Sequence, residues 1–188
     1  MSVGIEISSE TMERVQTLLA KIPKGAERAY SNAINRGLSR IKSTAWKEVK
    51  QVYTVQNSAL NAATNTRVQK ASTGNLAGYV SFSGCKIPLY KFKVTPKQPG
   101  SKKLVHASVK KGGGATFESA FIAAMKSGHI GMFEREGRKR LPVSEFMGLS
   151  AAQMVGEQTV SEQLQQEAQR LVEERLEHEI DRLLNLGG

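Results

Sequence analysis

Residues 26–52, AERAYSNAINRGLSRIKSTAWKEVKQV, carry a helical repeat that decides the fold of the first half of the chain. Apolar side chains recur there at every third or fourth position: Tyr30, Ile34, Leu38, Ile41, Ala45, Val49 and Val52. Because an α-helix has about 3.6 residues per turn, this spacing puts them all on one face. Trp46 lies beside that face and is interpreted as a packing residue. The stretch predicts one long amphipathic helix.

The end of the chain has the same repeat. Residues 150–186 predict one long helix, or two helices joined near Gly156, with an acidic outer face. The predicted apolar stripe is Val160, Leu164, Ala168, Leu171 or Val172, Leu176, Ile180 and Leu183. A shorter helix is predicted from Ser8 or Ser9 to Ile22, where the sequence Pro23-Lys24-Gly25 ends it.

Between the helices the pattern favours strands. A short helix is predicted over residues 55–63, and strands over 76–82, 86–94, 104–110, 120–125 and 129–133. In the second of these strands, Lys91 and Lys93 are expected on one face, and Tyr90, Phe92 and Val94 on the other.

The predicted fold class is therefore α+β: an antiparallel β-sheet of four to five strands packed with a long N-terminal-half helix and a long C-terminal helix. Residues 1–188 are expected to form a single domain. It is helical over about 1–52, mostly β over 66–147, and ends in a C-terminal helix or helical arm over 150–186.

The charge is distributed unevenly. The chain has a net charge of +10, and between Val49 and Phe117 there are 11 basic residues, all but one of them lysine, and no Asp or Glu. Such a segment repels itself unless it lies against a polyanion, an acidic protein or salt. Nucleic acid, contacted through its phosphates, is the first candidate partner; an acidic subunit surface and a merely solvated surface are the alternatives. The candidate nucleic-acid-binding residues are Lys86, Lys91, Lys93, Lys97, Lys102, Lys103, Lys110 and Lys111.

The residue types that carry catalysis are sparse. Asp181 is the one aspartate, and the three histidines have no metal-ligand spacing. Cys85 is interpreted as a small packing residue. The sequence therefore predicts no catalytic residue, no cofactor, no metal site and no enzymatic activity. It shows neither a signal peptide at its start nor a stretch of about 18 apolar residues for a membrane helix.

An acid–base mixture follows the lysine-rich segment. Glu134, Glu136 and Glu145 are interleaved with basic residues and are interpreted as a solvated ion-pair surface. The basic residues are Arg135, Arg138, Lys139 and Arg140.

Residues 117–155, FESAFIAAMKSGHIGMFEREGRKRLPVSEFMGLSAAQMV, contain an ordered set of motifs. "AFIA" precedes a glycine hairpin, "GMFER" precedes a basic run and "LPV", and a helix begins at "GLSAAQM". Upstream, "AINRGL" at residues 33–38 and "KIPLYKF" at residues 86–92 occupy the expected helix and strand. This order resembles the minor tail protein Z family of phages. Gly148-Leu149 departs from it, because the family pattern has Gly-Pro there.

The resemblance implies a structural tail-completion protein at the head-proximal end of a long phage tail, helping to join the tail to the head and to seat the DNA end. The expected partners are further copies in a ring, possibly a hexamer, the tail terminator, the tail tube, the head–tail connector and DNA without sequence preference; no membrane is involved. The expected location is the virion tail, and the host cytoplasm during assembly. Helix residues proposed for subunit interfaces are Tyr30, Ile34, Leu38, Leu164, Leu171 and Ile180. The alternative is a sequence-independent nucleic-acid-binding architectural or ribosome-associated protein of a bacterial cell.

Overall fold

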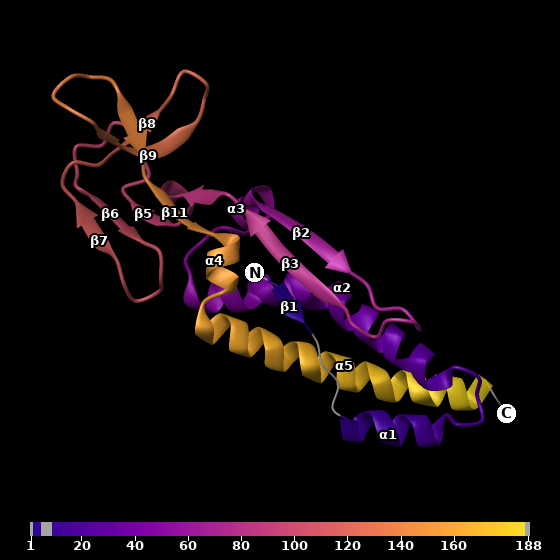
Figure 1. Ribbon diagram of the computed structural model, residues 1–188. Helices are drawn as coiled ribbons and strands as arrows, with labels where there is room; N and C mark the ends of the chain where they lie inside the picture. Colours follow the sequence, from indigo (N-terminus) through magenta and orange to yellow (C-terminus); the bar gives the residue numbers. More distant parts are fainter. Residues whose placement is uncertain (1, 5–8, 187–188) are drawn as a thin grey trace. The chain divides into compact units, whose positions relative to one another are not determined.

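Long helices and small antiparallel sheets make up the chain in the computed structural model, which describes residues 2–4 and 9–186 (Figure 1). The chain divides into two compact units, where the sequence predicted one domain. The helical unit comprises Met1–Glu48, Thr66–Phe82 and Gly156–Gly188, and the strand-rich unit comprises Val49–Asn65 and Ser83–Val155. The α+β class with two long helices is confirmed. The strands, however, form three three-stranded sheets and one two-stranded sheet, not a single sheet.

The helical unit is built on two long helices, α2 (Gly25–Val52) and α5 (Gln158–Leu186), and also contains the shorter α1 (Ser9–Leu18). In Figure 1, α5 runs beside α2 in the opposite direction. Asn32 on α2 donates a hydrogen bond to Glu179 on α5 over 3.0 Å, which fixes the two helices against each other. A sheet of β1 (Ser2–Gly4), β3 (Tyr79–Gly84) and β2 (Thr64–Gln69), in that order, completes the unit.

The predicted apolar stripes of both long helices are buried. On α2, every member of the stripe is buried except Val52, which is half-buried. On α5, the stripe was predicted to contain either Leu171 or Val172. Val172 is the buried one and Leu171 is half-buried, because steps of four residues continue from Leu164 through Ala168 to Val172. On α1, Leu18 is exposed, and the helix ends there instead of at the predicted Ile22. The predicted start at Ser8 lies outside the described residues.

Two side chains of α2 hold the rest of the helical unit. The Trp46 ring lies 5.5 Å from the Phe82 ring of β3, centroid to centroid, so its predicted packing role is confirmed. The Asn35 amide both donates to the Ala71 carbonyl and accepts from the Ala71 N–H, each over 2.9 Å. This paired contact fixes the segment between β2 and β3 on the helix without a strand.

The strand-rich unit contains α3 (Asn57–Ala63), a single turn η1 (Leu89–Lys91), α4 (Ala151–Val155) and three sheets. One sheet has the order β5-β6-β7, another β10-β9-β8, and the third pairs β11 with β4. Their bounds are Lys86–Pro88 (β4), Lys93–Thr95 (β5), Val105–Ser108 (β6), Ala115–Phe117 (β7), Phe121–Ala124 (β8), Ile130–Arg135 (β9), Val143–Glu145 (β10) and Met147–Ser150 (β11).

The strand predicted over residues 86–94 is interrupted, and the prediction of one continuous strand there is wrong. Pro88 cannot donate a ladder hydrogen bond, and the chain turns through η1, where the Phe92 N–H donates to the Leu89 carbonyl over 3.0 Å. The predicted separation of faces therefore holds only after the turn: Phe92 and Val94 are buried and Lys93 is exposed, whereas Tyr90 and Lys91 are both half-buried.

The entry into the C-terminal helices is capped. The Ser150 hydroxyl accepts from the Gln153 N–H over 3.3 Å, and the Gln153 side chain accepts from the Ser150 N–H over 3.0 Å. This reciprocal capping box starts α4 directly after Gly148-Leu149. Of the two predicted arrangements, the structure has two helices, since α4 ends at Val155 and α5 begins at Gln158.

Gly78 provides a stability test of the helical unit. A Cβ atom there would lie 2.7 Å from Leu38 Cδ1 and 2.9 Å from Ile34 Cγ2, and both side chains are buried and cannot move aside. We expect Gly78→Ala to lower the free energy of unfolding by about 1–3 kcal/mol, measured by urea denaturation. Gly74→Ala is the matched control, because nothing lies within 4 Å of its Cβ position. Equal stability of the two variants would contradict this packing.

Candidate functional site

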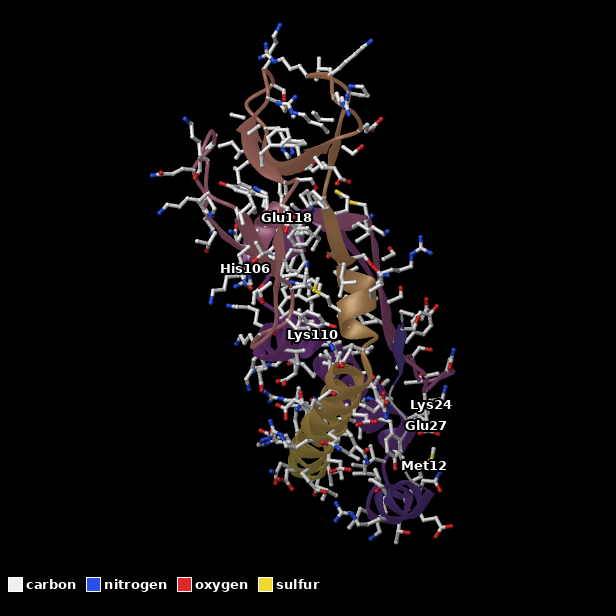
Figure 2. The ribbon with its side chains drawn as sticks, turned by 90° about the vertical axis from the view of Figure 1, so that its left-hand side faces the viewer. Met12, Lys24, Glu27, His106, Lys110 and Glu118 are labelled. Atoms are coloured by element: carbon white, nitrogen blue, oxygen red, sulfur yellow. The ribbon has the colours of Figure 1, made fainter. Side chains whose placement is uncertain are left out.

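The net charge of the protein belongs to one unit. The strand-rich unit holds 14 Lys and Arg against 4 Glu, a net charge of +10, whereas the helical unit holds 13 basic and 13 acidic residues and is neutral. Figure 2 shows nitrogen-tipped side chains projecting from the strand-rich unit around His106. The cationic surface is therefore a property of this unit and not of the whole chain.

A groove in the strand-rich unit brings three of the predicted lysines together. Lys93, Lys97 and Lys111 line it, and its volume is about 640 Å³. The other lining residues are Thr54, Gln56, Phe92, His106, Ser108, Gly112 and Gly113. Among the described residues that line this lysine groove, none is Asp or Glu, so nothing there neutralises the three ammonium groups.

Thr54 builds the lysine groove by joining two strands that are far apart in sequence. Its hydroxyl donates to the Ser108 carbonyl over 2.5 Å and accepts from the Lys93 N–H over 3.1 Å. Its own N–H donates to the Val109 carbonyl over 3.0 Å. Thr54, which follows α2 by two residues, thus pairs with backbone groups at the start of β5 and at the end of β6. These contacts fix the position of the Lys93 backbone.

The turn after β6 closes the other side of the lysine groove. The Lys111 N–H donates to the Val52 carbonyl over 2.8 Å, which anchors the start of the turn. At Gly114 the backbone has φ +152°, and a Cβ atom would lie 2.5 Å from His106 Nε2. Glycine is therefore required for the turn to lie against His106, whose ring is also 3.3 Å from the Thr116 hydroxyl across the sheet.

The other predicted lysines are placed differently. Lys86 and Lys110 line a second groove of about 550 Å³ with a largely apolar floor that includes Leu89, Phe117 and Phe146. The Lys110 ammonium lies 5.7 Å from the centroid of the Tyr53 ring, within cation–π range. Lys91 is half-buried in η1, and Lys102 and Lys103 are exposed in the loop between β5 and β6.

The predicted interface residues are placed mostly in the core of the helical unit. Tyr30, Ile34, Leu38, Leu164 and Ile180 are at most 3% exposed, and Leu171 is half-buried. Their side chains are covered within the single chain. A contact between copies would have to use other residues of these helices.

Tyr30 is buried in this core, and its hydroxyl is affected by that burial. Its hydroxyl donates to the Thr11 carbonyl over 3.1 Å, and burial raises its pKa from the ordinary 10.0 to about 12, with the nearby Arg14 charge opposing the shift. Folding therefore favours the neutral phenol.

The residue types that commonly carry catalysis or bind metals are dispersed over the described part of the chain. In the described part of the chain, no three His, Cys, Asp or Glu side chains are close enough to hold a metal ion. His129 pairs with Glu145 over 2.8 Å, while His106 belongs to the lysine groove. Cys85 is exposed, so its predicted packing role is wrong; it directly follows Gly84, the last residue of β3.

A second basic cluster, which was not predicted from the sequence, lies in the turn between β9 and β10. Glu136 is hydrogen-bonded to the Ser144 hydroxyl, and Glu145 pairs with His129. Among the described residues, the side chains of Arg138, Lys139 and Arg140 have no ion-pair partner, so the predicted ion-pair surface is wrong here. Turn residues in "EGRKRLP" were the available signal, because a tight turn exposes consecutive side chains.

The family model described as prophage minor tail protein Z (GPZ) matches residues 12–186, nearly the whole chain. The chain belongs to the minor tail protein Z family. No curated protein and no solved structure gives a significant match. The family is one of structural phage tail proteins, so the resemblance inferred from the motifs in residues 117–155 is confirmed. Membership in this family implies a location in the virion tail. Within the described ranges, the helices of this minor tail protein lack an apolar stretch long enough to cross a membrane.

Tyr30 gives a titration test of the core. Because the folded pKa of about 12 exceeds the unfolded value of 10.0, the stability that this group contributes is complete below pH 10 and is lost as the pH rises toward 12. We expect the tyrosinate absorbance difference between the parent protein and Tyr30→Phe to show one phenol titrating near pH 12. A difference curve centred near pH 10 would show that Tyr30 is hydrated.

Proposed function

We propose that this minor tail protein completes the head-proximal end of the tail as a ring of copies, with the strand-rich unit turned toward DNA. The observation that carries the proposal is the separation of charge: +10 on the strand-rich unit and zero on the helical unit. A ring component next to the end of the packaged DNA needs one cationic side and one side compatible with protein neighbours.

The lysine groove fits contact with the DNA backbone. Lysine offers a compact charge on a flexible stem, which suits phosphates at varying positions better than the reading of base edges. Thr54, Gln56, His106 and Ser108 add hydrogen-bonding groups beside the ammonium groups without adding negative charge. Binding should therefore be independent of sequence and depend strongly on salt.

The other proposed partners are tail proteins: the tail terminator, the tail tube and the head–tail connector, in addition to further copies of this chain. Six copies would match the usual six-fold symmetry of tail tubes. The proposed role is to bind and position, with no catalytic step. Family membership favours this role over a nucleic-acid-binding architectural or ribosome-associated protein of the bacterial cell.

DNA binding tests the lysine groove. We expect the protein to bind unrelated duplexes equally, with each lysine that meets a phosphate contributing about 0.9 to the slope of log affinity against log salt. Replacing Lys93, Lys97 and Lys111 with Gln should lower this slope by up to about 3. The measurement is fluorescence anisotropy over a salt series.

The matched control removes the same charge from the helical unit, by replacing the exposed lysines Lys21, Lys42 and Lys47 with Gln. It should change the slope by less than about one. If both triple variants lose the same slope, the total charge matters and the lysine groove does not. If the parent protein fails to bind at low salt, its cationic side faces acidic protein instead.

The position in the tail tests the assembly. We expect electron microscopy of tails with a tagged chain to show several copies at the head-proximal end, and tails that lack the chain to fail in joining to heads. One copy per tail, or density at the distal tip, would overturn the proposal. A monomer in free solution is compatible with it, because a tail end can template the ring.

A further inference from the structure

The turn between β9 and β10 presents four consecutive exposed side chains, Arg138, Lys139, Arg140 and Leu141, here called the basic finger. Val143 pairs with Arg135 at its base, so the finger extends from a closed hairpin. Arg135 stiffens that base: its guanidinium donates to the Arg140 carbonyl over 2.6 Å and lies 5.1 Å from the centroid of the Phe121 ring. The finger is thus held out from its sheet by contacts that leave its own side chains free.

Leu141 distinguishes the basic finger from the lysine groove. It is 66% exposed, the highest value among the exposed large apolar side chains of the described residues. An apolar side chain beside two arginines fits a protein surface that offers carboxylates around an apolar recess, because anchors of this kind are buried at the centre of interfaces with charges at the rim. Arginine forks also match carboxylates in two-point contacts. A DNA backbone would satisfy the cations and leave Leu141 in water.

The helical unit has a surface of this chemistry along α1 and α5. The α5 segment carries seven Glu and Asp against three Arg, a net charge of −4. Arg14 of α1 forms an ion pair with Glu177 of α5, and both helices run in the same direction in Figure 1. One turn further along, the same register brings Leu18 level with Asp181, and Leu184 follows on α5.

Leu18, Asp181 and Leu184 therefore form what is here called the α1–α5 patch. The two leucines are 46% and 44% exposed, and neither contributes to the apolar core. Asp181 is exposed and has no ion-pair partner among the described residues. The patch therefore offers an exposed carboxylate together with exposed leucines from α1 and α5, which complements the cations and the exposed leucine of the basic finger.

We propose that the basic finger of one copy docks on the α1–α5 patch of a second copy, with Leu141 between the two leucines and Arg140 at Asp181. The contact joins the strand-rich unit of one chain to the helical unit of the next, so it is heterologous and can repeat around an axis until a ring closes. The proposal rests on the proposed function, since it names the surfaces by which the copies at the tail end meet.

Crosslinking in assembled tails tests the contact. In a Cys85→Ser background, which removes the one native cysteine, Leu141→Cys with Leu184→Cys should give a ladder of multimers with a short bismaleimide. Leu141→Cys alone should stay monomeric. The matched control, Lys102→Cys with Leu184→Cys, uses an exposed loop of the same strand-rich unit and should give no ladder.

Charge exchange tests the pairing. Arg140→Glu and Asp181→Arg should each lower the number of tail-bound copies at limiting protein by about tenfold, and the double variant should restore most of it, since the two charges again attract. Lys102→Glu, an equal change of charge elsewhere in the unit, should have little effect.

The outcomes separate this proposal from the proposed function. Several copies at the head-proximal end without a ladder would overturn the finger contact and leave the function standing. A ladder at another position in the tail would support the contact and overturn the location. Loss of DNA binding in Arg140→Glu without rescue by Asp181→Arg would assign the finger to DNA and overturn the contact.

Discussion

Repulsion among the cations of the strand-rich unit is the constraint on which the rest of the structure depends. Fourteen basic side chains share this unit with four carboxylates, and two of the four are engaged by Ser144 and His129. The repulsion is stronger where Lys93, Lys97 and Lys111 line one groove, because Coulomb repulsion increases as charges approach each other. A small unit with sheets of two and three strands can hold such a surface only because its interior is apolar and its turns keep the ammonium groups in water. An external anion would relieve the repulsion, and this is the physical basis of the proposed contact with DNA.

Local pattern was sufficient for the helices. The apolar repeat predicted α2 nearly to the residue and most of the buried face of α5, because each turn of helix is stabilised by residues that are near in sequence. Sheets were harder. Strands β4, β5, β7 and β10 have three residues each, too few for an alternating pattern to be seen, and their pairing joins distant segments. Pro88 is a local signal, but the turn that follows depends on a hydrogen bond from the Leu89 N–H to the Phe146 carbonyl, which no local pattern predicts.

The sequence predicted which residue types make up the candidate site, but not where in the fold they come together. An acid-free lysine-rich segment is visible in the sequence, but the lysine groove exists because Thr54 reaches residues 39 and 54 positions away. Nothing in the neighbourhood of Thr54 distinguishes it from other threonines. The interface residues show the converse: an apolar stripe was visible, but Ile34 and Leu38 are covered by the segment around Gly78 within the same chain. An apolar stripe indicates burial without indicating which chain provides the cover.

Because the apolar stripes of its helices are buried within the same chain, this protein has little exposed apolar surface left for assembly. In the proposed assembly, contacts between copies would therefore be small and rich in charge, with isolated anchors such as Leu141. Interfaces of this kind are weak one at a time and depend on salt. They become stable when a template supplies several at once, because each additional contact in a closed ring forms at high effective concentration. Under the proposed function, a minor tail protein built in this way would remain dispersed until a tail end gathers it, because its uneven charge would keep free copies apart and would then attract neighbouring subunits and DNA in the ring.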